Sequence, residues 1–336
     1  MASLVQFGND LYTGARSFDF VGRRRVWYVI AAVLLAISVL VPVLRGGFVF
    51  GIEFRGGSEF QVAGVQGEPD QQVATDTVEG IVADASPRVT LVGDAANRSV
   101  RVQTEQLGAE ESTEVRNALA EAYDVPVGDV TASFIGPTWG QDISFAAIRA
   151  LVIFIVLAAV FMWIYFRTWK MALAANLSLL HVMVITVGVY GVFGFEITPA
   201  AVIGFLTILG YSLYDSVVVF DKVRENTAED AESTTRTFAE SVNLGANQTL
   251  VRSINTGVIA ALPVAAILFV GAWLLGAGTL RDIALALFVG IIVATYSTIF
   301  IAAPIYAHLR EGEQGIRQRT QRILANRAAS REAVQA

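Results

Sequence analysis

The sequence predicts a membrane-embedded bundle of six α-helices, with one small α+β domain of ferredoxin-like order inserted between the first and second helices. The 336 residues are 54% hydrophobic with a mean hydropathy of +0.56, values typical of a polytopic membrane protein. Six apolar runs each have the length that crosses a hydrocarbon core of roughly 30 Å. A polar segment at 50–145 separates the first run from the others. Because the chain has no cysteine, it forms no disulfide and no thiolate metal site.

The first spanning helix is expected at 26–44, VWYVIAAVLLAISVLVPVL. It follows a polar, mixed and cytoplasmic segment at 1–25 that ends in three arginines. An arginine run before an apolar stretch is also typical of a cleaved signal peptide. This stretch is longer than a usual signal core and no A-x-A site follows it, so we expect a retained helix.

The segment at 50–145 has the pattern of one small α+β domain. Strand and helix spacings alternate along it in the order β-α-β-β-α-β, with strands at 58–65, 89–93, 99–104 and 130–135 and helices at 69–85 and 109–123. This is the order of the split βαβ, ferredoxin-like pattern. About 90 residues suffice for one core. The segment contains no metal, nucleotide or nucleophile motif.

Charge is distributed unevenly between this domain and the rest of the chain. Residues 51–145 hold 16 Asp or Glu and 5 Lys or Arg, a balance of −11, whereas the remainder carries +5. An acidic module is therefore attached to a membrane body with basic flanks. Since the basic residues are spread over separate loops and form no stripe with aromatic residues, nucleic acid is not an expected partner.

Five further spanning helices are expected in the region 146–307, at 146–166, 171–193, 199–220, 254–275 and 283–307. A polar connector at 221–252 joins the fourth and fifth helices and could contain a short amphipathic helix with Phe238, Val242 and Leu244. A polar tail at 308–336 follows the sixth helix. Small residues predict close helix packing, and they are Gly188, Gly191 and Gly194 on the third helix and Gly290 and Ala294 on the sixth.

The basic residues of the connectors predict the orientation. Lys222, Arg224, Arg236 and Arg252 lie between the fourth and fifth helices, and six arginines follow the sixth. The connector at 194–198 has no Lys or Arg. Because cytoplasmic loops are enriched in Lys and Arg, we expect both termini and the connector 221–252 in the cytoplasm, and the acidic domain on the outer side.

Asp215 is the acidic residue that the fourth helix places inside the membrane. It lies in the stretch PAAVIGFLTILGYSLYDSVVVFDKVREN, roughly 10 Å from the cytoplasmic end by helical rise. An acid at membrane depth costs at least ~2.5 kcal/mol on insertion scales, and such residues usually face protein or a water-filled path. A functional site is therefore the first hypothesis, and a structural tie between helices is the second. Asp221 and Arg224 indicate a solvated helix end.

Polar residues on four helices are expected to surround Asp215. Tyr211 and Ser212 precede it by four and three residues and so share its face of the helix. The residues of the neighbouring helices are Arg252, Asn255 and Thr256 on the fifth, Thr295, Tyr296, Ser297 and Thr298 on the sixth, and His181 on the third. If the fourth and fifth helices pack together, Arg252 approaches the level of Asp215.

A buried carboxylate beside a guanidinium has the physics of a proton relay. Low dielectric favours the neutral acid and a nearby cation favours the charged form, so a change in their separation switches proton binding. The alternative for Arg252 is that it reaches to the lipid headgroups, and the alternative for His181 is a satisfied core histidine. One carboxylate among hydroxyls suits either a proton or a sodium ion.

The chain resembles the SecF-type subunits of the SecDF protein-export complex. These subunits form a branch of the RND transporter superfamily. The resemblance covers nearly the whole chain, and the most specific motif is GYSLYDSVVVFDKVREN at 210–226. The others are GIEFRGG at 51–57, GPTWGQDI at 136–143, NQTLVRSINT at 247–256 and ATYSTIFIAAP at 294–304. The fold that this family implies is a six-helix RND half-module.

The resemblance also implies roles for individual residues. Asp215 corresponds to the family's proton-carrying carboxylate and Arg252 to its functional basic partner. Gly51, Glu53, Gly56, Gly57, Asp221 and Arg224 belong to the family motifs as structural residues. Two positions depart from the family pattern, since Glu53 stands where Asp is usual and Val182 follows His181 where Asp is expected. The second departure leaves the route of the relay and the role of His181 open.

The implied function is protein export. With a SecD-like subunit in a heteromer, such a chain uses proton-motive force to assist preprotein translocation at the outer side of a prokaryotic cell membrane. The implied partners are SecD, the SecYEG translocon, YidC, YajC, preprotein substrates and membrane lipids. We expect no enzymatic activity, no catalytic residue, no cofactor and no metal. The alternatives are an RND-type exporter subunit for lipids or small molecules, and a structural scaffold of the translocon in which Asp215 only ties helices together.

Overall fold

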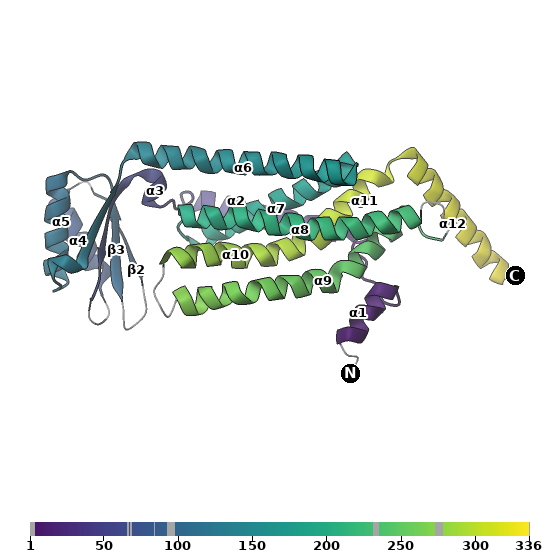
Figure 1. Ribbon diagram of the computed structural model, residues 1–336, viewed down its shortest axis with the longest axis horizontal. Helices are drawn as coiled ribbons and strands as arrows, with labels where there is room; N and C mark the ends of the chain where they lie inside the picture. The colour runs from purple at the N-terminus through teal and green to yellow at the C-terminus, as the bar shows by residue number, and fades with distance from the viewer. Residues whose placement is uncertain are drawn as a thin grey trace.

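The structure, a computed structural model, describes residues 4–65, 67, 69–83, 85–92, 98–230, 235–272 and 278–335. Long helices run side by side as a bundle, and a small sheet with its helices caps one end (Figure 1). Both termini lie at the opposite end of the bundle (Figure 1). Because the chain passes through the bundle an even number of times, it begins and ends on the same side. The sheet domain is inserted after the first helix, so it lies on the side opposite to the termini.

Six helices of the described chain are long and apolar enough to cross a membrane, which confirms the predicted number. They are α2 (Arg24–Leu44), α6 (Pro137–Phe166), α7 (Trp169–Phe193), α8 (Pro199–Glu229), α9 (Phe238–Ala266) and α10 (Gly278–Ser297). Helix α9 continues into the π-helix η2 (Ile267–Ala272), and α10 continues through the π-helix η3 (Thr298–Ala302) into α11 (Ala303–Glu311). The end of the predicted fifth span, 273–275, lies outside the described residues.

Several helices extend beyond the predicted spans. Helix α6 begins at Pro137, so one continuous helix leads from the sheet domain into the bundle. Helix α8 runs to Glu229, and α9 begins with a capping box at Thr237, so most of the described part of the connector 221–252 is helical. The expected amphipathic segment, with Phe238 and Val242 buried, forms the first turns of α9. An apolar run predicts only the part of a helix that lies inside the membrane. The polar extensions of the helix are stabilised by caps and charge pairs instead.

Glycines allow α8 and α10 to approach closely at the centre of the bundle. A Cβ at Gly290 would collide with Ile208, and one at Gly204 would collide with Ala286. Gly188 and Gly191 face Ser38 and Pro42 of α2 in the same way. These contacts confirm the predicted close packing. Gly194 does not pack against a neighbouring helix as Gly188 and Gly191 do. With φ of +72°, it ends α7 as a left-handed cap.

The sheet domain lies between α2 and α6 and contains every predicted strand and helix. After the short helix α3 (Ile52–Arg55), its elements are β1 (Gly57–Val62), α4 (Gln71–Ile81), β2 (Arg88–Val92), β3 (Ser99–Thr104), α5 (Ala109–Ala122), η1 (Val127–Asp129) and β4 (Val130–Ile135). The strands form an antiparallel sheet in the order β2-β3-β1-β4. Residue 93 of the predicted second strand lies outside the described residues.

Alternating apolar residues build the core of this domain on one face of the sheet. Phe60 pairs with Val102 of β3 and with Ala132 of β4. Phe60 and Val102 are fully buried, together with Val78 of α4 and Leu119 of α5. Period-two alternation in strands places these side chains on the side that the two helices cover.

The segments flanking the bundle at the terminal end are also helical. The amino-terminal helix α1 (Leu4–Thr13) packs against α9, and Leu11, Phe20 and Val21 are buried in the core cluster there. Asn243 and Asn247 of α9 accept hydrogen bonds from the backbone of residues 18–21. At the carboxyl terminus, the basic helix α12 (Gln314–Gln335) extends away from the bundle (Figure 1).

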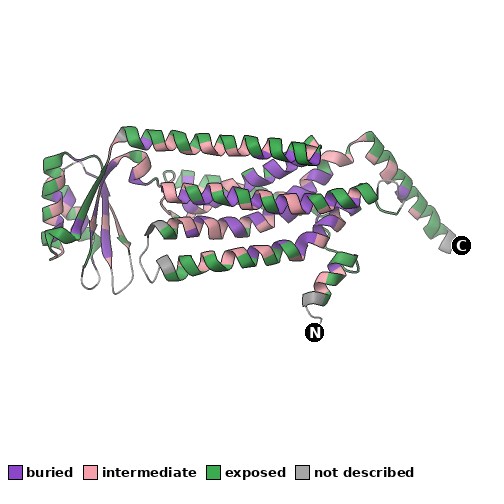
Figure 2. Cartoon of the chain, in the orientation of Figure 1, coloured by how far each residue is buried: buried purple, intermediate pink, exposed green. Residues whose placement is uncertain are grey.

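Large apolar side chains cover the outside of the bundle. Exposed residues form long bands on α6 and on the half of α9 nearer to the sheet domain, whereas buried residues concentrate on α7, α8 and α10 (Figure 2). Only 11% of the residues in the most apolar windows of α6 and α9 are buried. Such faces require either lipid or other helices around them.

Candidate functional site

Asp215 lies in the interior of the bundle, as predicted. Its relative exposure is 3%. One carboxylate oxygen, Oδ1, accepts a hydrogen bond of 2.8 Å from Ser253 Oγ of α9. The other oxygen, Oδ2, is buried without a hydrogen-bond partner among the described residues. Half of the carboxylate is therefore bonded and half is available to a proton, a water molecule or an ion.

Helix α8 carries further unbonded hydroxyls within about one turn of Asp215 in the sequence, and Tyr211 and Ser212 share its face of the helix. Tyr211 and Ser212 precede Asp215 by about one turn, and Ser216 follows it directly. The hydroxyl oxygens of all three are buried without a hydrogen-bond partner in the described part of the chain. A hydroxyl group rotates freely and can donate or accept. The surroundings of Asp215 can therefore stabilise either the neutral acid or the carboxylate.

A second polar cluster joins α7 to the end of α10. His181 Nδ1 lies 3.1 Å from Ser297 Oγ, and Ser297 Oγ lies 2.8 Å from Ser178 Oγ. The ring of Tyr296 is 6.2 Å from the imidazole, measured between centroids. His181 Nε2 has no hydrogen-bond partner among the described residues. His181 is therefore held at one nitrogen and unbonded at the other.

The π-helix η3 brings the two clusters together. Ser297 bonds to α7, and the next residue, Thr298, lies near Asp215 of α8 while its hydroxyl donates to Ala294 O at 3.0 Å. Both of these side chains are fully buried. A π-turn is rare, and it often occurs at functional sites. Here Ser297, the last residue of α10, and Thr298, the first residue of η3, face two different neighbouring helices.

Arg252 lies beside the site without bonding to it. Because Ser253 faces Asp215, the preceding side chain points to an adjacent side of α9, where Arg252 is exposed. Arg252 interacts electrostatically with Asp215 but forms no hydrogen bond or ion pair in the described part of the chain. Asn255 is exposed and Thr256 is half-buried. The structure thus brings Asp215, Tyr211, Ser212, His181 and Ser297 into the interior and leaves the predicted polar residues of α9 near its outer face.

Thr295 packs between helices at the edge of the site. Its hydroxyl donates to the backbone carbonyl of Ile291 at 3.0 Å, within its own helix. A Cβ at Gly257 of α9 would come within 2.6 Å of that hydroxyl. Thr295 therefore marks a close approach of α9 and α10 and is bonded locally.

The structural motif residues 51–57 form the junction between the sheet domain and the bundle. Gly51 N–H donates to Ile197 O at 3.0 Å, and Ile197 N–H donates to Val49 O at 2.8 Å. Gly57, at a φ of +142°, packs so closely that a Cβ would collide with the carbonyl of Thr104. Burial, and then the neighbouring Glu196 carboxylate, raises the pKa of Glu53 above its ordinary value. Glu53 Oε2 has no hydrogen-bond partner among the described residues.

The remaining motif residues have local roles. Gly56, with φ of +75°, ends α3 and donates its N–H to Ile52 O at 2.7 Å. Asp221 is exposed on α8. Arg224 is exposed as well, and its guanidinium donates to Tyr165 O of α6 at 3.5 Å. Both positions are exposed, as expected, but the helix does not end there, since α8 continues to Glu229.

The sequence reasoning missed Ser253 and Ser178, which supply hydrogen bonds to Asp215 and Ser297. Ser178 precedes His181 by three residues and so shares its helix face, which was an available signal. Ser253 directly follows Arg252, and the pattern of α9 does not distinguish which of the two faces inward.

Comparison with known families gives one match over more than half of the chain. Residues 115–312 match the family model described as protein export membrane protein SecD/SecF, C-terminal. This range includes the five helices from α6 onward and therefore both polar clusters.

Curated relatives carry a consistent name. The chain is 42% identical to the protein translocase subunit SecF of Mycobacterium leprae, covering 94% of this chain and 69% of the relative. It is also 42% identical to that of Streptomyces coelicolor, covering 98% of this chain and 86% of the relative. The protein translocase subunit SecDF of Thermus thermophilus is 32% identical, and the match covers 38% of its length.

Solved structures agree with these relatives. The crystal structure of SecDF from Thermus thermophilus, a translocon-associated membrane protein, superposes with a TM-score of 0.74 at 30% identity. The match covers 88% of this chain and 39% of that chain. A second SecDF structure, in a super-membrane-facing form, matches with a TM-score of 0.58 at 27% identity, over 96% of this chain and 40% of that one. The chain thus spans about two fifths of the solved SecDF chains.

Proposed function

The chain belongs to the SecD/SecF family of protein-export membrane proteins, and we propose that within this export role it is the SecF-type subunit whose Asp215 carries protons to drive translocation. The observation that carries the proposal is a fully buried carboxylate bonded at one oxygen only. An intramembrane acid is expensive to keep and marks a proton or ion path by default.

The surroundings of Asp215 support both states of a proton carrier. With a proton on Oδ2, the side chain is neutral and stable in an apolar bundle. Without it, the unbonded hydroxyls of Tyr211 and Ser212, on the same face of the helix about one turn away, can turn toward the charge. Ser253 stabilises Oδ1 in either state. Unbonded oxygen atoms are also ligands for a sodium ion, so an imposed proton gradient in the absence of a sodium gradient distinguishes the two ions.

Arg252 is the proposed switch for this carrier. It lies one residue from Ser253 and already interacts with the carboxylate through space. A rotation of α9 that brings the guanidinium inward would favour the charged form, and the reverse rotation would favour proton uptake. His181 is bonded at Nδ1 and unbonded at Nε2, which suits a supporting role on the far side of Thr298.

A SecD-type subunit is the proposed partner in the membrane. Relatives named SecDF combine more than twice the length of this chain in one polypeptide. The exposed apolar faces of α6 and α9 offer area for partner helices. The SecYEG translocon, YidC, YajC and preproteins are proposed as partners of the assembled complex, on the family resemblance alone.

The proposed location is a prokaryotic cell membrane, with both termini in the cytoplasm and the sheet domain outside as a ferredoxin-like module. The basic helix α12 lies at the terminal end of the bundle (Figure 1), and the positive-inside rule assigns that end to the cytoplasm. The acidic sheet domain then meets the emerging preprotein.

A structural scaffold is the second candidate, because the bond between Ser253 and Asp215 also ties α9 to α8. Replacement of Asp215 by Asn separates the two functions. The variant keeps size and polarity but carries no titratable proton. We expect proton-gradient stimulation of preprotein translocation to disappear in membrane vesicles that contain Asp215→Asn with its SecD-type partner, while basal ATP-driven translocation remains.

Asp230→Asn is the matched control, since Asp230 is also buried and caps the same helix with a hydroxyl partner, Ser241 at 2.7 Å. Co-purification of the SecD-type subunit verifies assembly of each variant. If assembled Asp215→Asn responds to the gradient as fully as the wild type does, the proton role is wrong and the scaffold function replaces it.

A further inference from the structure

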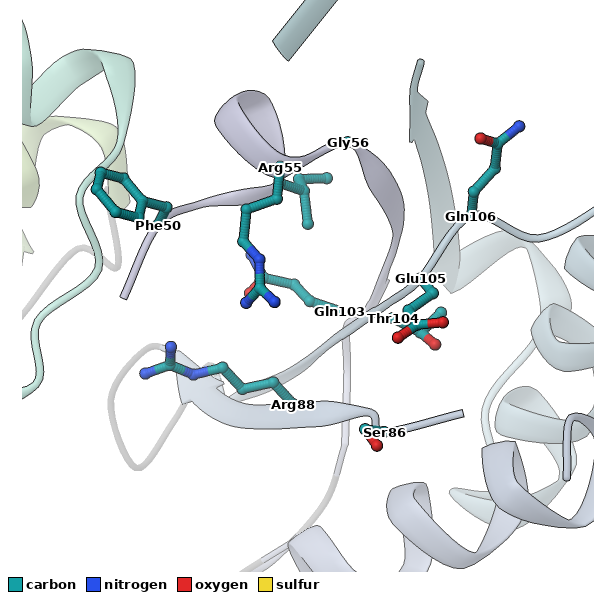
Figure 3. A pocket seen from close by; sticks show the side chains of 10 residues that line it. Phe50, Arg55, Gly56, Ser86, Arg88, Gln103, Thr104, Glu105 and Gln106 are labelled. Atoms are coloured by element: carbon teal, nitrogen blue, oxygen red, sulfur yellow. The ribbon is translucent and has the colours of Figure 1, made fainter. Parts of the chain in front are cut away.

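A pocket lies at the junction of the sheet domain and the bundle, far from Asp215. Its volume is about 260 Å³, and its walls come from the motif segment before β1, the start of β2 and the end of β3 (Figure 3). Two arginines, Arg55 and Arg88, extend their guanidinium groups into the same space (Figure 3). None of these residues belongs to the polar clusters of the bundle.

Both arginines lack a carboxylate partner among the described residues. Arg55 forms no hydrogen bond or ion pair there, and Arg88 makes one long contact of 3.5 Å to Gly194 O. The segment around them has a balance of −11, so carboxylates are abundant in the domain. Glu105 is the acidic member of the lining, which leaves the lining with a charge of +1. That charge matches one singly ionised phosphodiester.

The pocket lies at the depth of lipid headgroups. Gly194 caps the spanning helix α7, so its contact places Arg88 at the end of the hydrocarbon layer. Phe50 forms the wall on the side of the two guanidinium groups (Figure 3) and is 44% exposed. An apolar wall beside two cations fits a ligand that joins an anion to a hydrocarbon chain.

We propose that this pocket binds the phosphate group of an anionic phospholipid from the leaflet on the side of the sheet domain. Arginine presents a planar fork of donors that matches phosphate oxygens. Thr104 and Gln103 at the end of β3 complete the lining beside the two arginines. Phe50 packs against the glycerol and the first acyl carbons. The lipid then fastens the sheet domain to the membrane surface.

Native mass spectrometry of the purified, delipidated chain tests the proposal, with phosphatidylglycerol titrated into the detergent solution. We expect one tightly bound lipid in the wild type and an apparent Kd about tenfold weaker in Arg55→Gln/Arg88→Gln, because each guanidinium supplies charge-assisted hydrogen bonds. Arg45→Gln is the matched control, since Arg45 donates to Val192 O at the same end of α7 but lies outside the pocket lining. Its Kd should equal that of the wild type.

Two further measurements, on a single-site variant and with inorganic phosphate as a competitor, separate the possible outcomes. Arg55→Gln alone changes an exposed side chain without a described partner, so its fold should be intact and its lipid affinity several-fold weaker. Inorganic phosphate at the same concentration should fail to displace the lipid. Equal lipid affinity in the wild type and the arginine variants overturns the proposal. Displacement by inorganic phosphate alone assigns the pocket to small anions and overturns the lipid.

Discussion

At the scale of single residues, the site depends on one carboxylate whose two oxygens differ in their hydrogen bonding. Ser253 fixes Oδ1 of Asp215 at 2.8 Å, and Oδ2 is unbonded in the described structure. This asymmetry gives the proton a defined position, because the bonded oxygen is occupied by a donor. The serine therefore positions the carboxylate without carrying the proton itself.

Replacing Ser253 with alanine should separate positioning from proton carriage. The change leaves a buried oxygen without its donor, so we expect the free energy of unfolding to fall by about 1 kcal/mol. Gradient-stimulated translocation should fall several-fold, and Ser253→Thr should restore it because it keeps the hydroxyl. Thr256→Ala, on the same helix and outside the site, is the control and should show wild-type stimulation. Full stimulation in Ser253→Ala would contradict the positioning role.

At the scale of helices, the centre of the bundle depends on the close contact of α8 with α10. Gly290 lies directly over the fully buried Ile208, and Gly204 lies over Ala286. These contacts hold η3 against α8, and so they hold Thr298 near Asp215. The spacing of small residues therefore supports the site indirectly.

Gly290→Ala should loosen this contact. The added methyl group overlaps Ile208, and overpacking of a close interface costs about 1–3 kcal/mol. We expect a lower midpoint of thermal unfolding for the purified chain in detergent. Gly210→Ala is the matched control, because Gly210 is on α8 and a Cβ there meets no atom within 4 Å. Equal midpoints for the two variants would show that the α8–α10 contact has room to adjust.

The sequence predicts the bounds of the strands better than it predicts the rotation of the helices. The strands Ser99–Thr104 and Val130–Ile135 have the predicted bounds, because alternation and turn residues mark strand ends locally. The rotation of α9 was not predictable in this way. The turns around Arg252, NQTLVRSINT at 247–256, carry polar residues around most of the circumference, so the pattern does not distinguish whether Arg252 or Ser253 faces Asp215. The π-turn of η3 has no sequence signature either, since it arises from packing against two helices.

At the scale of the whole molecule, α8 links the site to the sheet domain. The helix begins at Pro199, two residues after Ile197, whose backbone pairs with Val49 and Gly51. By helical rise, Asp215 lies roughly 24 Å further along the same rigid element. Gln103 of β3 donates to Glu196 Oε1 at 2.8 Å across this junction, and it also donates to Glu59 Oε2 of the neighbouring strand β1 at 2.9 Å. A shift of α8 on protonation would therefore reach the sheet domain directly.

The junction also makes the stability of the molecule depend on pH through Glu53. Burial, and then the Glu196 and Glu59 carboxylates, raises the pKa of this acid in the folded state above its ordinary 4.5. Between the ordinary and the raised value, the folded chain keeps a proton that the unfolded chain has released. Stability therefore falls as pH rises through this window, and it stays low above it.

Glu53→Gln should remove this dependence, since the amide is neutral at every pH and similar in size. We expect the variant to unfold at a higher temperature than the wild type at about pH 8, and the difference should shrink toward about pH 4, where the wild-type acid is largely neutral in both states. Glu79→Gln, an exposed position on α4, is the control and should leave the unfolding temperature close to that of the wild type at both pH values. A gain that is the same at both pH values would show that Glu53 opposes the junction through shape and not through charge. A loss of stability at about pH 8 would show that its carboxylate has a partner in solution, such as a cation, that makes the charged form the favourable one.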